Sequence, residues 1–230
     1  MLGSVYGGGR LASVGTQFTA PEDPNYGSFL EDDDNGTHGH VTINISGGII
    51  GNDDENTVIE ANGHITGGNV FGGSMGRLTR LDGSPNELWA RLAQVKSYTI
   101  KISGNATIKS NVYGGAEFGT TRDNVYVTIG GTRETNGSIS KDTGTTATIN
   151  GHVYGGGYGS TEDGAAYYSV IDAGTTKYLF TPMQYAGCVG SNTEVDVVGG
   201  HVKRNVYGGG EMASVGVIDY SVQEDENGTS

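Results

Sequence analysis

The chain has 230 residues, 42 of them glycine, and its 13 basic and 26 acidic side chains give a net charge of -13 at neutral pH. This charge disfavours a nucleic-acid partner, because proteins bind DNA and RNA largely by neutralising phosphates with basic side chains. The single cysteine, Cys188, excludes an internal disulfide, and no apolar run is long enough to span a bilayer, so we expect no membrane insertion.

A short glycine motif recurs five times along the chain and marks a structural period. In every copy, valine and an aromatic residue stand before two or three glycines. The copies are Val5-Tyr6-Gly7-Gly8-Gly9, Asn69-Val70-Phe71-Gly72-Gly73, Asn111-Val112-Tyr113-Gly114-Gly115, His152-Val153-Tyr154-Gly155-Gly156-Gly157 and Asn205-Val206-Tyr207-Gly208-Gly209-Gly210. The first and last copies also share the tail Ala-Ser-Val-Gly, at 12–15 and 213–216. Such recurrence indicates a repeat architecture and not one catalytic loop.

A second element travels with the glycine motif and alternates β-branched apolar residues with polar ones. This alternation with a period of two is typical of a strand with one buried face. It occurs at 41–48, 98–104, 125–131 and 194–200, and short links follow at 106–110, 147–151 and 201–204. The predicted unit is therefore a strand, a turn, a short strand, a turn and the aromatic motif.

The compact spacing of these elements predicts the fold. From Gly104 to Gly130 is 26 residues, one full period with little insertion, and solenoids repeat every ~20–45 residues. We therefore expect an all-β protein, a right-handed parallel β-helix (a solenoid) of about five coils, in which like residues align from coil to coil. The whole chain, 1–230, is expected to be one solenoid segment and a fragment of a longer protein.

The alignment of coils gives specific expectations for the motif residues. The motif valines should point inward, and Asn69, Asn111 and Asn205 should form a ladder at one corner, with His152 in place of asparagine in its coil. The glycines should allow positive φ at the corners and close approach of neighbouring coils. Whether the motif aromatics face inward or outward stays open at this point.

Five insertions interrupt the repeat, at 16–39, 52–62, 74–97, 132–145 and 158–192. The third contains a capping box, Ser84-Pro85-Asn86-Glu87, followed by Leu88, Leu92 and Val95 at helical spacing. We expect one short helix here, packed on the solenoid. Trp89, the only tryptophan, lies beside this apolar stripe, and a ligand platform is the functional alternative for it.

The repeat units resemble the glycine-rich Val-Tyr-Gly-Gly-Gly regions of very large surface or secreted proteins of gut bacteria, in Bacteroidota and Clostridia. More distantly, they are similar to β-helical adhesins and autotransporter passengers. The resemblance covers roughly Val41 to Gly216 without the insertions. It implies an extracellular or cell-surface location in a bacterium and an adhesive or scaffold role without enzyme activity. Implied partners are neighbouring domains of the same protein, glycans and surface proteins of host or bacterium.

Two other functions remain open. Polysaccharide lyases and glycoside hydrolases also use β-helices, but their paired carboxylates must converge on one face. Of the polygalacturonase-like motifs, the chain has Asp-Asp, while Asn192-Thr193-Glu194 comes last instead of first and neither Gly-His-Gly nor Arg-Ile-Lys occurs. A phage or fibre-like assembly module, which would form an obligate trimer, is the second alternative. Solenoid ends without caps also lead us to expect end-to-end or other self-association.

Two acidic clusters are candidate metal sites, and no other cofactor is expected. Carboxylate and amide oxygens suit a hard cation such as Ca²⁺. The first cluster partly matches the start of an EF-hand loop, but Thr42 stands where the twelfth-position glutamate is needed. Ordinary solvated turns are the alternative. The residues concerned are Asp32, Asp33 and Asp34 in one cluster and Asp53, Asp54 and Glu55 in the other.

Tyrosines in the last long insertion are the candidate ligand-binding residues, because loops on a rigid scaffold often carry function. Together with the helix tryptophan, the predicted glycan-binding residues are Trp89, Tyr158, Tyr167, Tyr168 and Tyr178. Cys188 has no neighbouring histidine or aspartate in the sequence, and we expect it to be a small buried residue.

Overall fold

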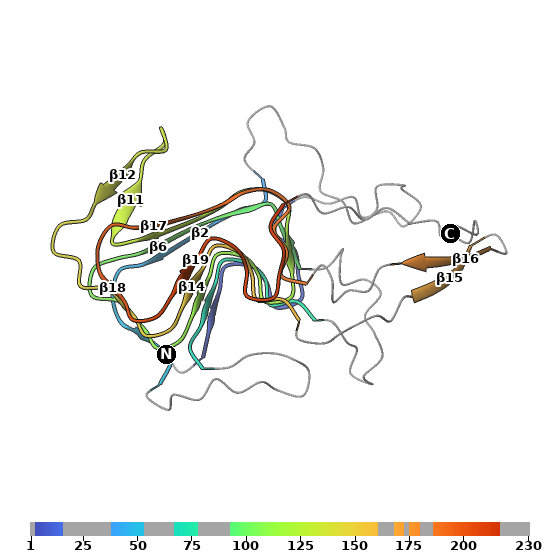
Figure 1. The fold of residues 1–230 in the computed structure, drawn as a ribbon, viewed down its shortest axis with the longest axis horizontal. Helices are drawn as coiled ribbons and strands as arrows, with labels where there is room; N and C mark the ends of the chain where they lie inside the picture. The colour runs from blue at the N-terminus through green and yellow to red at the C-terminus, as the bar shows by residue number, and fades with distance from the viewer. Residues whose placement is uncertain are drawn as a thin grey trace.

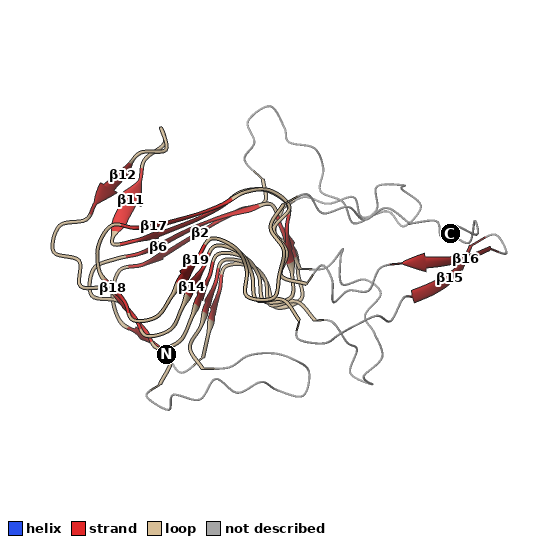
Figure 2. Cartoon of the chain, viewed as in Figure 1, coloured by secondary structure: helices blue, strands red, loops and turns tan. Residues whose placement is uncertain are grey.

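The computed structural model describes residues 3–15, 38–52, 67–77, 93–160, 168–172, 175–179 and 186–216. These residues form strands, turns and bends, and none of them is in a helix (Figure 2). The prediction of an all-β protein is therefore confirmed. No segment of the described residues forms a helix long and apolar enough to cross a membrane.

The five copies of the glycine motif form one parallel sheet. Its strands lie side by side in the order of the sequence, and each valine and each aromatic pairs with its counterpart in the next copy. The strands are β1 (Val5–Tyr6), β4 (Val70–Phe71), β8 (Val112–Tyr113), β14 (Val153–Tyr154) and β19 (Val206–Tyr207). The recurrence seen in the sequence is thus a recurrence in space.

The alternating strands form a second parallel sheet and the short links a third, both as predicted. The long strands are β2 (His40–Ile45), β6 (Ser97–Ile102), β10 (Val125–Ile129) and β17 (Thr193–Val197). The short strands are β3 (Ile49–Ile50), β7 (Thr107–Ile108), β13 (Thr148–Ile149) and β18 (His201–Val202). Both sheets also follow the order of the sequence, so the chain passes repeatedly from a long strand to a short strand to an aromatic strand (Figure 1).

A fourth set of parallel pairings closes each repeat before the next long strand begins. It contains the paired strands β5 (Gln94–Val95) and β9 (Thr120–Thr121). Isolated bridges join Val14 to Val95, Thr121 to Val189, and Val189 to Val215. The shared tails Ala-Ser-Val-Gly of the first and last motif copies therefore occupy the two ends of this set.

The side chains between the sheets form two adjoining clusters. The larger is aliphatic, because the β-branched positions of the long and short strands point inward and align, as in the ladder of Ile45, Ile102 and Ile129. The motif valines Val70, Val112 and Val153 belong to the same cluster and are fully buried, as predicted. The smaller cluster is aromatic. Burying β-branched and aromatic side chains is the main driving force available to this glycine-rich chain.

A ladder of side-chain acceptors joins the five motif copies at the residue before the valine. The backbone N–H of Asn69 donates to Ser4 Oγ at 3.1 Å, and that of Asn111 donates to Asn69 Oδ1 at 3.1 Å. The N–H of His152 donates to Asn111 Oδ1 at 2.8 Å, and that of Asn205 donates to His152 Nδ1 at 3.2 Å. The predicted ladder is confirmed for the side chains of Asn69, Asn111 and His152, whereas Asn205 joins it through its backbone N–H. Ser4 adds a first rung that the sequence had not suggested.

The motif glycines are required by close packing and not by backbone conformation. A Cβ placed on Gly72 would lie 2.0 Å from the carbonyl oxygen of Gly114, and one on Gly114 would lie 2.1 Å from that of Gly155. None of the motif glycines has a positive φ, so that part of the prediction is wrong. Positive φ follows the long strands instead, for example 56° at Gly104 and 74° at Gly130, where the chain turns sharply.

Two antiparallel hairpins depart from the repeat. The predicted insertion 132–145 holds strands β11 (Gly131–Arg133) and β12 (Ile139–Lys141). The predicted insertion 158–192 holds strands β15 (Tyr168–Asp172) and β16 (Thr175–Leu179). Figure 1 shows β11–β12 projecting beside the long strands, whereas β15–β16 lies away from the parallel sheets.

The predicted helix is corrected at its C-terminal end. Val95, expected to belong to the helical stripe, lies in strand β5, because its side chain is needed in the aliphatic core. The capping box and the other stripe residues, with Trp89, lie outside the described residues. The remaining insertions, at 16–39 and 52–62, also fall mostly outside them.

Candidate functional site

The motif aromatics form a continuous column of stacked rings, which we call the aromatic column. Neighbouring ring centroids are 4.8–5.0 Å apart and the ring planes differ by 3–13°. The members are Tyr6, Phe71, Tyr113, Tyr154 and Tyr207. The column forms because the strands that carry the rings pair in register, so each ring is placed one strand spacing from the next.

The question of which way the motif aromatics face is settled in favour of the interior. Phe71 is 0% exposed, Tyr113 1% and Tyr154 7%, whereas Tyr207 at the end of the column is 41% exposed. Tyr158 and Phe118 pack against the column from the side, with the Tyr158 ring edge-on to Tyr113 at 5.8 Å. The interior part of the column is thus a packed core, and only its end ring offers a broad exposed face.

Two glutamates bind the hydroxyl groups of the column. Tyr6 Oη donates to Glu117 Oε2 at 2.6 Å, and Tyr113 Oη donates to Glu211 Oε2 at 2.5 Å. In both cases the glutamate belongs to the motif copy two positions further along the stack, and Glu117 is completely buried. Sequence reasoning missed both residues. The signal was present, since glutamate follows the aromatic by four residues in the third and fifth copies.

The buried phenols Tyr113 and Tyr154 of the column, and Tyr158 beside it, stay protonated at neutral pH. Burial raises the pKa of Tyr113 far above its usual value, and the hydrogen bond and negative charge of Glu211 raise it further. Burial also raises the pKa of Tyr154, and it raises the pKa of Tyr158 to about 12 with help from Glu211 and Glu117. These tyrosines act as hydrogen-bond donors and packing groups, and none of them can serve as a base.

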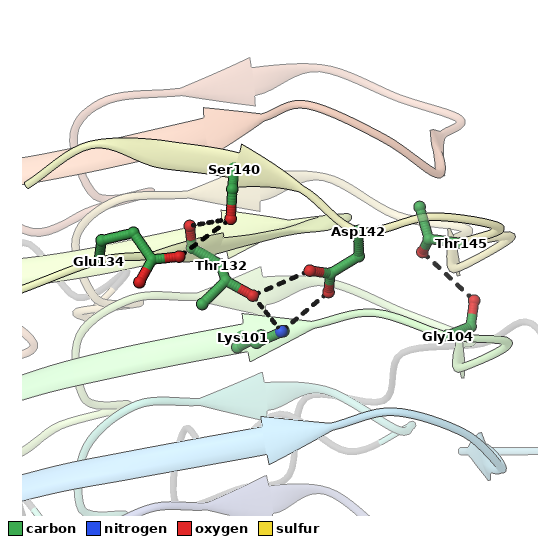
Figure 3. A network of polar contacts seen from close by, with 7 residues as sticks. All are labelled: Lys101, Gly104, Thr132, Glu134, Ser140, Asp142 and Thr145. Atoms are coloured by element: carbon green, nitrogen blue, oxygen red, sulfur yellow. Dashed lines mark hydrogen bonds and ion pairs between the residues drawn. The ribbon is translucent and has the colours of Figure 1, made fainter.

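A second gathering of polar side chains fastens hairpin β11–β12 to the long strands (Figure 3). Lys101 Nζ of β6 donates to Thr132 Oγ1 at 2.5 Å and forms an ion pair with Asp142 Oδ2 at 2.8 Å. Thr132 Oγ1 in turn donates to Asp142 Oδ1 at 2.8 Å. The pKa of the Asp142 carboxyl lies below its usual value, chiefly because Lys101 and then Thr132 donate hydrogen bonds to it.

Arg133 makes the second fastening of the same hairpin. Its guanidinium binds Glu194 and Asp196 of β17, the latter at 2.9 Å, and lies 4.4 Å from the ring centroid of Tyr126 on β10. Partial burial lowers the pKa of Arg133, but the hydrogen bonds and charges of Glu194 and Asp196 outweigh this and keep it above its usual value. The insertion is therefore anchored across three neighbouring strands.

Neither network has the arrangement that acid-base catalysis needs. Glycoside hydrolysis uses two carboxyl groups with room for the sugar between them. One is protonated and acts as the acid, and the other is ionised and acts as base or nucleophile. Here the neighbouring carboxylates of Glu194 and Asp196 are bridged by the arginine, and the hydroxyl of Thr132 is held between a cation and an anion. What the arrangement can do is hold an insertion rigidly on the sheet.

Of the five predicted ligand-binding residues, Tyr158, Tyr168 and Tyr178 lie in the described part of the chain. Tyr158 is 3% exposed and belongs to the aromatic cluster, so the structure gives it a packing role. Tyr168 and Tyr178 lie on the facing strands β15 and β16. Trp89 and Tyr167 lie outside the described residues.

The candidate metal ligands also fall outside the part of the chain that is described. This holds for the whole set, Asp32, Asp33, Asp34, Asp53, Asp54 and Glu55. Within the described ranges, no group of three or more histidine, cysteine, aspartate or glutamate side chains could hold a metal ion. Cys188 is buried, as predicted, and burial raises the pKa of its thiol, which disfavours the reactive thiolate form.

Comparisons of the chain with protein-family models, with curated proteins and with solved structures gave no match. The proposals that follow therefore rest on the residues of this chain and their contacts.

Proposed function

We propose that the repeated part of the chain is a right-handed parallel β-helix of about five coils. Three observations support this architecture. Strands of the same kind pair in parallel and in sequence order in three separate sheets, and a fourth series of bridges follows the same order. Side chains of the same kind align along the stack, in the aliphatic ladder, the aromatic column and the acceptor ladder.

We further propose that this segment is a non-enzymatic structural and adhesive part of a bacterial cell-surface or secreted protein. Its role is to give reach and to present insertions to glycan or protein partners. The observation that carries the proposal is hairpin β11–β12, an insertion clamped on the repeated sheet by Lys101 and Arg133. The ion pairs at this place hold the hairpin on the long strands, as expected of a scaffold that keeps its loops in fixed positions. The resemblance of the motifs to surface-protein repeats agrees with this role.

The test is a panel of plant, host and bacterial polysaccharides, with and without Ca²⁺, offered to the complete chain. Each is scored both for retention of the protein and for new reducing or unsaturated ends. The proposal expects retention of at least one polysaccharide without product. The double variant Tyr167→Ala/Tyr168→Ala should weaken retention if the last insertion binds the sugar. Lys203→Ala, an exposed change after strand β18 and away from both hairpins, is the control and should leave retention unchanged.

Each outcome decides between functions. Product formation would overturn the proposal in favour of a polysaccharide lyase or hydrolase. Retention that requires Ca²⁺ and disappears with a chelator would add a metal to the binding site. Absence of both retention and product across the panel would reject glycan binding and leave only protein partners for the proposed role.

A further inference from the structure

The two ends of the stack match each other residue by residue. Residues 4–15 and 205–216 each contain twelve positions and differ at only three of them, where Ser4, Arg10 and Leu11 replace Asn205, Glu211 and Met212. One segment carries the first strand of the motif sheet and the other carries the last. From this match and from the open bonding groups described below, we propose that a second copy of this chain docks its segment 4–15 on segment 205–216 of the first, head to tail.

Within the described ranges, the last motif copy has main-chain donors without an acceptor, at the side of the stack where a following copy would lie. In every earlier copy, the valine N–H and two glycine N–H groups donate to the following copy; Val153, Gly155 and Gly156 donate to the carbonyls of Asn205, Tyr207 and Gly209 at 2.9–3.0 Å. The equivalent groups in the last copy belong to Val206, Gly208 and Gly209. Among the described residues none of the three donates to an acceptor.

The first motif copy offers the matching acceptors. By the same register, a docked second copy would present the carbonyls of its Ser4, Tyr6 and Gly8 to these donors, because those residues correspond to Asn205, Tyr207 and Gly209. The acceptor ladder also continues. Asn205 Oδ1 has no donor within the described residues, whereas Asn69 and Asn111 each accept the N–H of the next copy. The N–H of the partner copy's Ser4 fits that place.

The apolar and charged side chains of the two ends also complement each other. Val206, Tyr207, Met212 and Val215 are 36–45% exposed at one end, and Leu11 is 42% exposed at the other. Docking would place Tyr6 of the second copy on Tyr207, extending the aromatic column by one ring, and would place Leu11 beside Met212. At the remaining differing position, Arg10 of the second copy would lie beside Glu211. Opposite charges would therefore face each other, whereas identical residues at this position would have given two like charges.

The glycines show where the second copy would sit. A Cβ on Gly7, Gly72, Gly114 or Gly155 would lie 2.0–2.2 Å from the carbonyl oxygen of the equivalent glycine in the following copy. Gly208 is the next member of this series, and in the described part of the chain no atom comes within 4 Å of its Cβ position. Among the described residues nothing requires a glycine at position 208, whereas a following copy would require one.

Association of this kind is open, because the docking faces are different and each added copy presents a fresh end. Backbone pairing of an added strand with an exposed sheet edge is a well-established mode of recognition. The inference goes beyond the proposed adhesive role and uses only the pairing of the motif copies.

The test is sedimentation of the complete chain over a range of concentrations up to millimolar. Oligomers that grow with concentration are expected. Gly208→Ala should raise the dissociation constant at least ~10-fold, because its methyl group would clash with a backbone carbonyl of the docked copy. The same variant should keep the circular dichroism and melting temperature of the unchanged protein. Lys141→Ala, an exposed change on hairpin β11–β12, is the control and should associate normally.

A second variant tests the charge pair without touching the glycine. Arg10→Glu should weaken association, because it places two carboxylates at the docking point, and Arg10→Lys should restore most of it. A protein that remains monomeric over the whole range, or a Gly208→Ala variant that associates as well as the unchanged chain, would overturn the proposal. So would association that appears only after residues 217–230 are removed, since the chain's own C-terminal segment would then be the occupant. None of these readouts involves glycan binding, so this inference and the proposed function can fail separately.

Discussion

The third and fifth copies of the glycine motif have almost the same sequence and different surroundings. Both read Asn-Val-Tyr-Gly-Gly, with glutamate four residues after the tyrosine. In the third copy, Val112 and Tyr113 are 0% and 1% exposed, whereas in the fifth, Val206 and Tyr207 are 45% and 41% exposed. How much a motif residue contributes to the free energy of unfolding should therefore depend on whether a following copy packs against it. Substitutions at matched positions of the two copies can measure this contribution.

The largest effect is expected at the glycine that directly follows the motif aromatic, which is Gly114 in the third copy and Gly208 in the fifth. Gly114→Ala should destabilise the fold by ~3 kcal/mol or more, because its Cβ would lie 2.1 Å from the carbonyl oxygen of Gly155 and the clash is with backbone. Gly208→Ala, at the matched position in the fifth copy, should change the free energy of unfolding by less than ~0.5 kcal/mol. Chemical denaturation of the two variants measures both values at low protein concentration. Equal losses would show that the fifth copy is covered as well as the third.

The second effect concerns pH and the buried phenols. Burial raises the pKa of Tyr158 to about 12, and it raises the pKa values of Tyr98, Tyr113 and Tyr154 further still. The unfolded chain has ordinary tyrosines with a pKa of ~10. Above that pH the unfolded state loses protons that the folded state keeps, so stability is intact below pH ~10 and falls as pH rises towards 12.

Stability measured between pH 9 and 12, together with tyrosinate absorbance, checks this expectation. Tyr158→Phe should reduce the alkaline loss because the substituted ring has no proton to lose. The unchanged protein, measured over the same pH range, provides the comparison. If Tyr158→Phe loses as much stability at alkaline pH as the unchanged protein, the result would contradict the assigned burial of this hydroxyl.

The smallest effect is expected in the acceptor ladder. His152→Ala should cost ~1 kcal/mol, because it removes the acceptor for the N–H of Asn205, whereas His152→Asn should be neutral within ~0.5 kcal/mol because asparagine fills the other interior rungs. Asn205→Ala, at the last rung, removes no acceptor that the described residues use. Thermal unfolding of the three variants ranks them. A loss from His152→Asn as large as from His152→Ala would reject the ladder.

The sequence by itself determined the repeated elements of this protein. Alternation of β-branched and polar residues placed all four long strands, and the recurring aromatic and glycines placed the motif strands, because the period of two and the spacing between copies are local properties. The acceptor ladder could also be predicted, since Asn69, Asn111, His152 and Asn205 stand at the same place in each copy.

Contacts between distant residues were decided only by the tertiary structure. No local sequence pattern predicts that Glu117 accepts a hydrogen bond from the hydroxyl of Tyr6, 111 residues earlier. The same holds for the ion pairs of Arg133 with Glu194 and Asp196 across the sheet. The prediction from local spacing was also wrong at Val95 in the third insertion. Val95 fits the spacing of a helical stripe, but it lies in strand β5 with its side chain in the aliphatic core. Tyr158, which looks like a loop residue in the sequence, is buried against Tyr113. The physical reason is the same in each case: stacking repeats brings together residues far apart in the chain, and burial between them outweighs what each short stretch prefers alone.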